Sequence, residues 1–173
     1  RLPGPFLVYV PPQDAPAVSE TPAISKGYVT FGSFNNLAKV NDRVLACWCT
    51  ILKAVPNSRI LLKCKPFASQ QLCNKMLKRF QEHGIDAERV DLVSLFPTTA
   101  EHLESYSNVD ISVDTFPYAG TTTTCEALYM GVPVVTLQHQ LGNHAHNVGV
   151  SLLSRIEGMN TLIAKNEQEV RNK

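Results

Sequence analysis

The sequence predicts an α/β fold in which helices cover both faces of a parallel, Rossmann-like sheet. Short apolar runs typical of strands alternate with segments of helical periodicity, and short connections join them. Several strand-like runs are apolar without interruption, which is typical of parallel strands that are buried on both faces. With 173 residues, the chain has room for one domain of this kind.

The composition limits the kinds of partner that the chain can attract. The net charge is +1, and lysines and arginines are spread along the chain instead of forming a basic tract. This pattern predicts no nucleic-acid partner. No apolar run approaches the roughly 18 residues that span a bilayer, so the sequence predicts no membrane partner either.

Residues 1–26 differ from the rest because they contain six of the eleven prolines and show no helical periodicity. We interpret them as an extended connector, in which Leu7–Val10 (LVYV) is one candidate strand. Residues 27–173 form the predicted lobe. A helix that starts at Asn166 would run past Lys173, so we expect the lobe to be truncated at its carboxyl end and the chain to be part of a larger protein.

The elements of the lobe follow from periodicity and from helix stop signals such as Pro56 and Gly84. In chain order, we expect strands at 27–34, 59–64, 89–95, 110–113 and 134–137. The expected helices lie at 41–55, 69–83, 99–107, from 121 to about Gly131, and from 166 onward. The apolar residues expected to face the core from the helix at 69–83 are Leu72, Met76, Leu77 and Phe80.

The most informative stretch runs from Asp114 to Thr136 (DTFPYAGTTTTCEALYMGVPVVT). A strand leads into a turn containing proline and glycine, and four threonines then open a helix. Ligands bind at such carboxyl ends of strands in open α/β sheets, and the free N–H groups of a first helical turn favour a phosphate. Glu126, one turn into the helix, could accept hydrogen bonds from a ribose. The alternative is that the threonines only cap the helix and that Glu126 is a solvated acid.

Other candidates are weaker when they are considered alone. In GSFNNLAK, Lys39 after the first strand could reach a phosphate, or it could be an exposed lysine beside a turn. His102 could contact a base or a sugar, but an exposed helix residue is the simpler interpretation. Lys63 and Lys65, at the end of the predicted strand 59–64, would add positive potential to the same edge of the sheet.

The histidines and cysteines do not form a metal-binding pattern. His144 and His146 have an HxH spacing, but no third ligand with suitable spacing is evident, so polar residues at a helix start are the better interpretation. The cysteines are odd in number and lack a CxxC motif, and we expect them to be small buried hydrophobic residues. They are Cys47, Cys49, Cys64, Cys73 and Cys125.

Five long segments together carry a family resemblance. They are FGSFNNLAKV, AVPNSRILLKCKPF, VDISVDTFPYAGTTTTCEALYMGVPVVTL, HAHNVGVSLL and LIAKNEQE. From about Gly27 to Val170, the chain resembles the carboxyl-terminal catalytic lobe of the O-GlcNAc transferase/SPINDLY family. The resemblance implies a GT-B glycosyltransferase, which moves a sugar from a nucleotide diphosphate to Ser or Thr hydroxyls of intracellular proteins. It also implies inversion at the sugar, no cofactor, no required metal, and a cytoplasmic or nuclear location.

Roles for individual residues follow from the same resemblance. Lys39 would be catalytic through its contact with the donor diphosphate, and Asn36 takes the place of a glutamine near it. Thr122 and Thr123 match a phosphate-binding pair, while Thr121 replaces a histidine beside them. The two remaining matches are Glu126, which would hold the ribose, and His102, which would lie against the base.

The resemblance leaves the donor open. Thr121, and Thr99 in place of a lysine near the ribose, are closer to the SPINDLY branch, for which the implied donor is GDP-fucose. Many proteins with similar sequence segments are assigned UDP-GlcNAc as the donor. The implied partners are the donor, Ser/Thr-containing acceptor proteins, and an amino-terminal catalytic lobe and tetratricopeptide repeats in the parent chain. The alternatives are a GT-B enzyme with a non-protein acceptor and a non-catalytic nucleotide-sugar sensor or scaffold.

Overall fold

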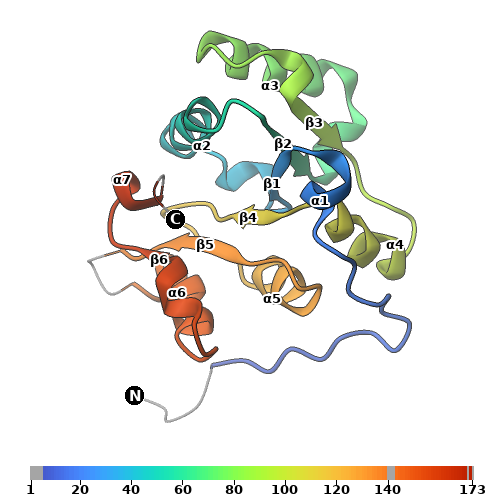
Figure 1. Ribbon diagram of the computed structural model, residues 1–173, viewed down its shortest axis with the longest axis vertical. Helices are drawn as coiled ribbons and strands as arrows, with labels where there is room; N and C mark the ends of the chain where they lie inside the picture. The colour runs from blue at the N-terminus through green and yellow to red at the C-terminus, as the bar shows by residue number, and fades with distance from the viewer. Residues whose placement is uncertain (1–5, 140–142, 171, 173) are drawn as a thin grey trace.

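The computed structural model describes residues 6–139, 143–170 and 172. A six-stranded parallel sheet forms its centre, in the order β3-β2-β1-β4-β5-β6 (Figure 1). The strands are β1 (Val29–Ser33), β2 (Ser58–Lys63), β3 (Val90–Val93), β4 (Ile111–Val113), β5 (Val134–Leu137) and β6 (Ile163–Ala164). The α/β fold and the parallel sheet predicted from the sequence are confirmed.

Helices cover both faces of this sheet and enclose two apolar clusters. Buried residues of α2 (Asp42–Ala54), α3 (Gln70–Glu82) and α7 (Glu167–Val170) belong to the cluster on one face. The cluster on the other face includes buried residues of α4 (Thr99–Glu104), α5 (Thr122–Tyr129) and α6 (Val148–Leu153). Figure 1 shows the two groups of helices on opposite sides of the strands.

The strand order reverses between β1 and β4. From β1 the chain continues through α2 to the neighbouring β2, whereas β4 lies on the other side of β1 and leads through α5 to β5. At the register of Phe31 with Ile111, these two central strands are hydrogen-bonded neighbours. The segments that leave them at their carboxyl ends therefore diverge toward opposite faces, which opens a crevice at this point of the sheet.

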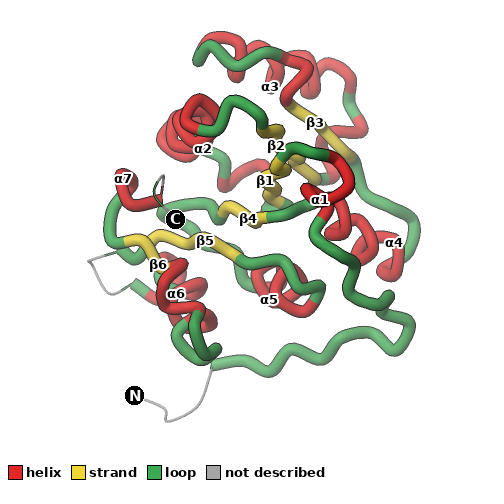
Figure 2. The backbone as a smooth tube through the Cα atoms, viewed as in Figure 1, coloured by secondary structure: helices red, strands yellow, loops and turns green. Residues whose placement is uncertain are grey.

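The amino-terminal segment differs from its prediction in two places. Leu7–Val10 is not a strand: Val8 and Val10 are 84% and 79% exposed, and the segment runs as a loop past α5 (Figure 2). Residues 22–26, expected to be extended, form the short helix α1 (Pro22–Lys26). Pro22 favours this helix because its ring fixes φ at a helical value, and Asp110 accepts hydrogen bonds from Ala23 N (2.8 Å) and Thr30 N (2.7 Å).

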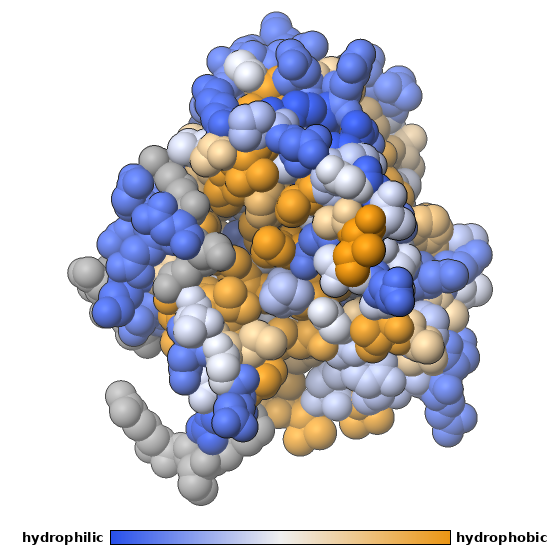
Figure 3. All heavy atoms as spheres, viewed as in Figure 1, coloured by the Kyte–Doolittle hydropathy of each residue, from blue (hydrophilic) through white to orange (hydrophobic). Residues whose placement is uncertain are grey.

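One apolar residue of α3 also departs from its prediction. Met76 and Phe80 are buried and Leu77 is half-buried, but Leu72 is 38% exposed. Leu72 lines a surface cavity instead of entering the core. On the face shown in Figure 3, the surface of α3 is mainly hydrophilic, while hydrophobic residues gather across the middle, over β4 and β5.

The cysteines largely follow the prediction. Four are buried, Cys73 is only half-buried, and none of the five is in a disulfide bond. Burial raises the pKa of Cys49 and of Cys64 to about 11, so these two thiols stay protonated at neutral pH. Within the described part of the chain, no helix is long and apolar enough to cross a membrane.

Candidate functional site

The first turn of α5 presents unused backbone donors. Thr121 is the N-cap residue, but its side chain makes no capping hydrogen bond. Among the described residues, the N–H groups of Thr122, Thr123 and Thr124 have no acceptor, and the first helical bond is made by Cys125 N to Thr121 O (3.1 Å). The capping role considered for the threonines is therefore not what Thr121 does. This helix end carries partial positive charge and free donors.

Lys39 lies beside the loop that leads into this helix, bonded to Ala119, which is 80 residues away in the sequence. It ends the 3₁₀ segment Leu37–Lys39 that follows β1. Its Nζ donates to Ala119 O at 2.9 Å and lies 4.1 Å from the centroid of the Tyr118 ring. Burial lowers the pKa of Lys39, and the nearby Asp114 opposes that shift. The ammonium is therefore partly desolvated and directed at the loop that precedes α5, as an anion site requires.

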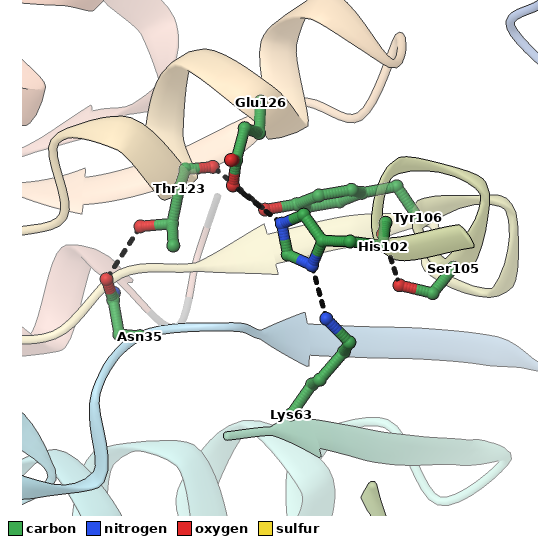
Figure 4. Close-up of polar contacts among 7 residues, drawn as sticks. All are labelled: Asn35, Lys63, His102, Ser105, Tyr106, Thr123 and Glu126. Atoms are coloured by element: carbon green, nitrogen blue, oxygen red, sulfur yellow. Dashed lines mark hydrogen bonds and ion pairs between the residues drawn. The ribbon is translucent and has the colours of Figure 1, made fainter. Parts of the chain in front are cut away.

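A second cluster of polar side chains connects β2, α4 and α5 (Figure 4). Lys63, at the end of β2, contacts His102 Nδ1, and His102 Nε2 lies 2.9 Å from Glu126 Oε2. The Tyr106 hydroxyl shares its single proton between the same Glu126 oxygen at 3.3 Å and Thr123 O at 3.2 Å. Burial is the main cause that raises the pKa of Tyr106, so this hydroxyl remains a donor. The residues expected at the ribose and the base are therefore in direct contact.

The contacts of His102 define its tautomer. An ammonium group has only protons to donate, so Nδ1 must accept from Lys63. A neutral ring then carries its proton on Nε2 and donates it to the Glu126 carboxylate. Burial lowers the pKa of Lys63, and Glu126 opposes the shift. Far from being an isolated exposed helix residue, His102 is held by partners at both nitrogens.

Two cavities meet at Lys63 and His102. The larger, about 710 Å³, is lined by Asn36, Lys65, Leu72 and other residues at the ends of β1 and β2. The smaller, about 360 Å³, is lined by the 95–99 segment, including Thr99, and by Glu126. Both volumes fall in the range of small-molecule sites. Three of the predicted site residues, Asn36, His102 and Glu126, therefore line hollow space.

The remaining predicted residues, Asn36, Thr122 and Thr123, lie at the same edge of the sheet and differ in exposure and in hydrogen bonding. Asn36 is exposed, and its side chain accepts from Ala38 N at 3.0 Å, so it shapes the Lys39 segment while it also lines the larger cavity. The Thr122 side chain is exposed. Thr123 is half-buried, and its hydroxyl donates to Asn35 Oδ1 at 2.7 Å. The structure brings the predicted residues together, while their binding roles remain predictions.

The sequence interpretation missed four residues that build the site. Asp114 and Asn35 connect the ends of β4 and β1 by a hydrogen bond of 3.0 Å. Phe34 packs against Tyr106 with ring centroids 4.3 Å apart and also faces His102 and Lys63. A signal for Asp114 was available, because a carboxylate directly after a buried strand has to find donors. Phe34 and Tyr106 carry no such signal, because an aromatic residue next to a strand or in a helix is equally typical of the core.

The HxH pair lies in the 3₁₀ segment His144–His146, which contacts the loop before α5 through a hydrogen bond from Ala119 N to Ala145 O (3.1 Å). The His144 ring packs against Phe6, and the His146 ring packs against His139 with centroids 4.7 Å apart. In the described ranges, no three His, Cys, Asp or Glu side chains are grouped as metal ligands.

Comparison with known proteins decides the family. The model of glycosyl transferase family 41 matches residues 19–172. This chain belongs to glycosyl transferase family 41. The Arabidopsis thaliana protein named probable UDP-N-acetylglucosamine--peptide N-acetylglucosaminyltransferase SPINDLY is 54% identical over 169 residues, which are 98% of this chain and 18% of the relative. A Caenorhabditis elegans UDP-N-acetylglucosamine--peptide N-acetylglucosaminyltransferase is 31% identical over 141 residues, which are 82% of this chain and 12% of the relative.

A solved structure agrees with the family 41 assignment. A mutant of Thermobaculum terrenum O-GlcNAc transferase superposes with a TM-score of 0.85 and 33% identity, covering 94% of this chain and 30% of that chain. The fold is therefore that of the carboxyl-terminal lobe of a GT-B glycosyltransferase, as predicted. The chain spans only about a fifth of the length of the SPINDLY relatives that it matches.

The tautomer of His102 is directly testable in the family 41 chain. In the neutral ring, we expect His102 to be protonated at Nε2 because Lys63 donates to Nδ1. Nitrogen NMR of the ¹⁵N-histidine-labelled chain reports the tautomer, and His102→Gln identifies its signal among the five histidines. Lys63→Met should weaken the preference for this tautomer without abolishing it, because Glu126 still accepts from Nε2. A ring protonated at Nδ1 in the unmodified chain would contradict the assignment.

Proposed function

We propose that this chain is the donor-binding lobe of an inverting protein O-glycosyltransferase. The observation that carries the proposal is the bond from Lys39 to the Ala119 carbonyl, in the loop that leads into the free first turn of α5. Asn36 and Glu126, from the same two segments, line two cavities at the carboxyl edge of the sheet. A cation and a helix N-terminus together suit a diphosphate, and the adjoining cavities suit a nucleoside and a sugar. Membership in family 41 and the names of the relatives support the same substrate class.

In this proposal, each residue contacts a different part of the donor. Lys39 and the N–H groups of Thr122 and Thr123 bind the diphosphate. Glu126 accepts from the ribose hydroxyls, and its bond to His102 sets the position of both side chains against the nucleoside. The donor is UDP-GlcNAc or GDP-fucose, and the acceptor is a Ser or Thr hydroxyl of a protein.

The chemistry follows from where charge develops. The bond from the anomeric carbon to the terminal phosphate oxygen breaks while the acceptor oxygen attacks the opposite face of that carbon. A base outside this chain removes the hydroxyl proton. Negative charge grows on the leaving diphosphate, where Lys39 and the α5 N-terminus are already in place. Groups that need no rearrangement during the reaction stabilise a transition state most effectively.

A calorimetric titration of the full-length protein tests the proposal and identifies the donor. The titration compares a uridine series, UDP and UDP-GlcNAc, with a guanosine series, GDP and GDP-fucose. The protein should bind one series and not the other. Binding of the uridine series supports GlcNAc transfer, and binding of the guanosine series supports fucose transfer. A protein that binds neither series would contradict the proposed donor site.

The role of Lys39 predicts a separation between turnover and folding. Lys39→Ala in the full-length protein should lower kcat by roughly 100-fold or more, because an electrostatic partner of the leaving group is lost. Its melting temperature should change little, since the side chain contacts only the Ala119 carbonyl and the Tyr118 ring among the described residues. Lys26→Ala, which removes a lysine bonded to Asn108, is the matched control and should leave kcat unchanged.

The pH dependence of donor affinity supplies a second readout for Lys39. Because burial lowers the pKa of Lys39, the free site loses this charge, and with it donor affinity, at a lower pH than an ordinary lysine would. Lys39→Arg should retain its charge to higher pH and flatten the alkaline limb of the profile. An unchanged turnover rate in Lys39→Ala would refute the assignment.

A further inference from the structure

A buried carboxylate organises the loop between β4 and α5. Asp114 is 6% exposed, and its Oδ1 accepts from Gly120 N (2.7 Å), Thr115 N (2.8 Å) and Asn35 Nδ2 (3.0 Å). Its Oδ2 accepts from the Thr136 hydroxyl at 2.8 Å. Both ends of the loop are therefore held at one side chain. The Ala119 carbonyl that receives the Lys39 ammonium lies within this loop, directly before Gly120.

The orientation of the Asn35 amide follows from Asp114. Asp114 Oδ1 already receives two backbone N–H groups and acts only as an acceptor, so Asn35 must direct its Nδ2 toward it. Asn35 Oδ1 then faces Thr123, and the Thr123 hydroxyl must donate to it, at 2.7 Å. The single proton of that hydroxyl is consequently used within the protein. Thr123 keeps its backbone N–H for an external anion.

The junction of these groups is closely packed around Gly120. A Cβ at this position would lie 2.7 Å from Thr123 Oγ1, 2.8 Å from Asn35 Oδ1 and 2.9 Å from Thr124 Oγ1. These distances are shorter than ordinary contacts, so the loop, the first turn of α5 and the end of β1 fit together only with glycine here. A shift of Asn35 would therefore be transmitted to the helix end.

We propose that Asp114 and Asn35 are positioning residues that hold the first turn of α5 and the Lys39 segment at the spacing of the two donor phosphates. A corollary is that Thr123 binds phosphate through its backbone N–H, while its hydroxyl anchors the helix to Asn35. This inference deepens the proposed function and rests on it. The predicted signature is a selective loss of affinity for the diphosphate group, because the nucleoside contacts at His102 and Glu126 do not involve Asn35.

The test compares nucleotides that differ only in phosphate number. For the full-length protein, calorimetry gives the affinities for the nucleoside diphosphate that binds, UDP or GDP, and for its monophosphate. Asn35→Ala should reduce the ratio of diphosphate to monophosphate affinity by roughly tenfold. Asn108→Ala, which removes an asparagine bonded to Lys26, is the matched control and should preserve the ratio.

A double-mutant cycle separates the anchoring role of Thr123 from direct phosphate binding. If its hydroxyl anchors the helix through Asn35, Asn35→Ala, Thr123→Val and the double variant should all lose a similar factor. If the hydroxyl donates to phosphate independently of Asn35, the two losses multiply, and the corollary is overturned.

Asp114 is tested by a conservative and a disruptive change. In Asp114→Asn, the amide oxygen can still accept from Gly120, Thr115 and Asn35, and the amide nitrogen can donate to the Thr136 hydroxyl. This variant should keep the diphosphate preference, whereas Asp114→Ala should lose it; if Asp114→Ala does not fold, Asn35→Ala decides. Equal weakening of monophosphate and diphosphate by Asn35→Ala would indicate a merely structural role and overturn the proposal. An unmodified protein that binds neither nucleotide would instead refute the proposed function.

Discussion

The reversal of strand order between β1 and β4 is the constraint on which the site depends. Because the chain leaves β1 toward one face and β4 toward the other, the segments after these adjacent strands diverge and leave room at the sheet edge. Lys39 comes from the first segment and the α5 N-terminus from the second. The bond from Lys39 to Ala119 joins them across this divergence. If β1 and β4 were not neighbours, the two groups would lie farther apart along that edge.

Partial burial strengthens the electrostatic interactions of the charged side chains at this edge. Lys39 and Lys63 both have pKa values lowered by burial, and each faces a polar partner, the Ala119 carbonyl or the His102 ring. Asp114 is buried enough for its pKa to be raised, although four donors oppose that shift. Such groups are fixed before a ligand arrives, and electrostatic interactions are stronger at a partly desolvated site than in open water. The positions of these charges are therefore a property of the folded lobe.

Much of the fold could be predicted because periodicity reports burial directly. The strands β1 to β5 and the helices α2 to α5 lie close to their predicted ranges. Two of the failures have a common cause, since an apolar run shows only that a segment can be buried. Leu7–Val10 finds no neighbouring strand and remains exposed, and Leu72 faces a cavity although its spacing matches that of Met76. These outcomes depend on tertiary neighbours that local pattern does not specify.

The site was predictable to the extent that it follows strand ends. Lys39 and the threonines could be placed on one rim because parallel strands end at one edge, and the family resemblance added His102 and Glu126. The contacts of Asn35 with Asp114 and Thr123 join residues 79 and 88 positions apart, which spacing in the sequence could not indicate. The link between Lys63 and His102 likewise depends on how α4 packs beside β2.

Hydrogen–deuterium exchange of the full-length protein, with and without the nucleoside diphosphate that it binds, tests the central claim most directly. If the diphosphate lies on the first turn of α5 beside Lys39, the amides of residues 120–124 and 35–39 should exchange more slowly in the complex. Saturation with nucleotide that leaves the 120–124 amides unprotected, while amides elsewhere slow down, would contradict the account.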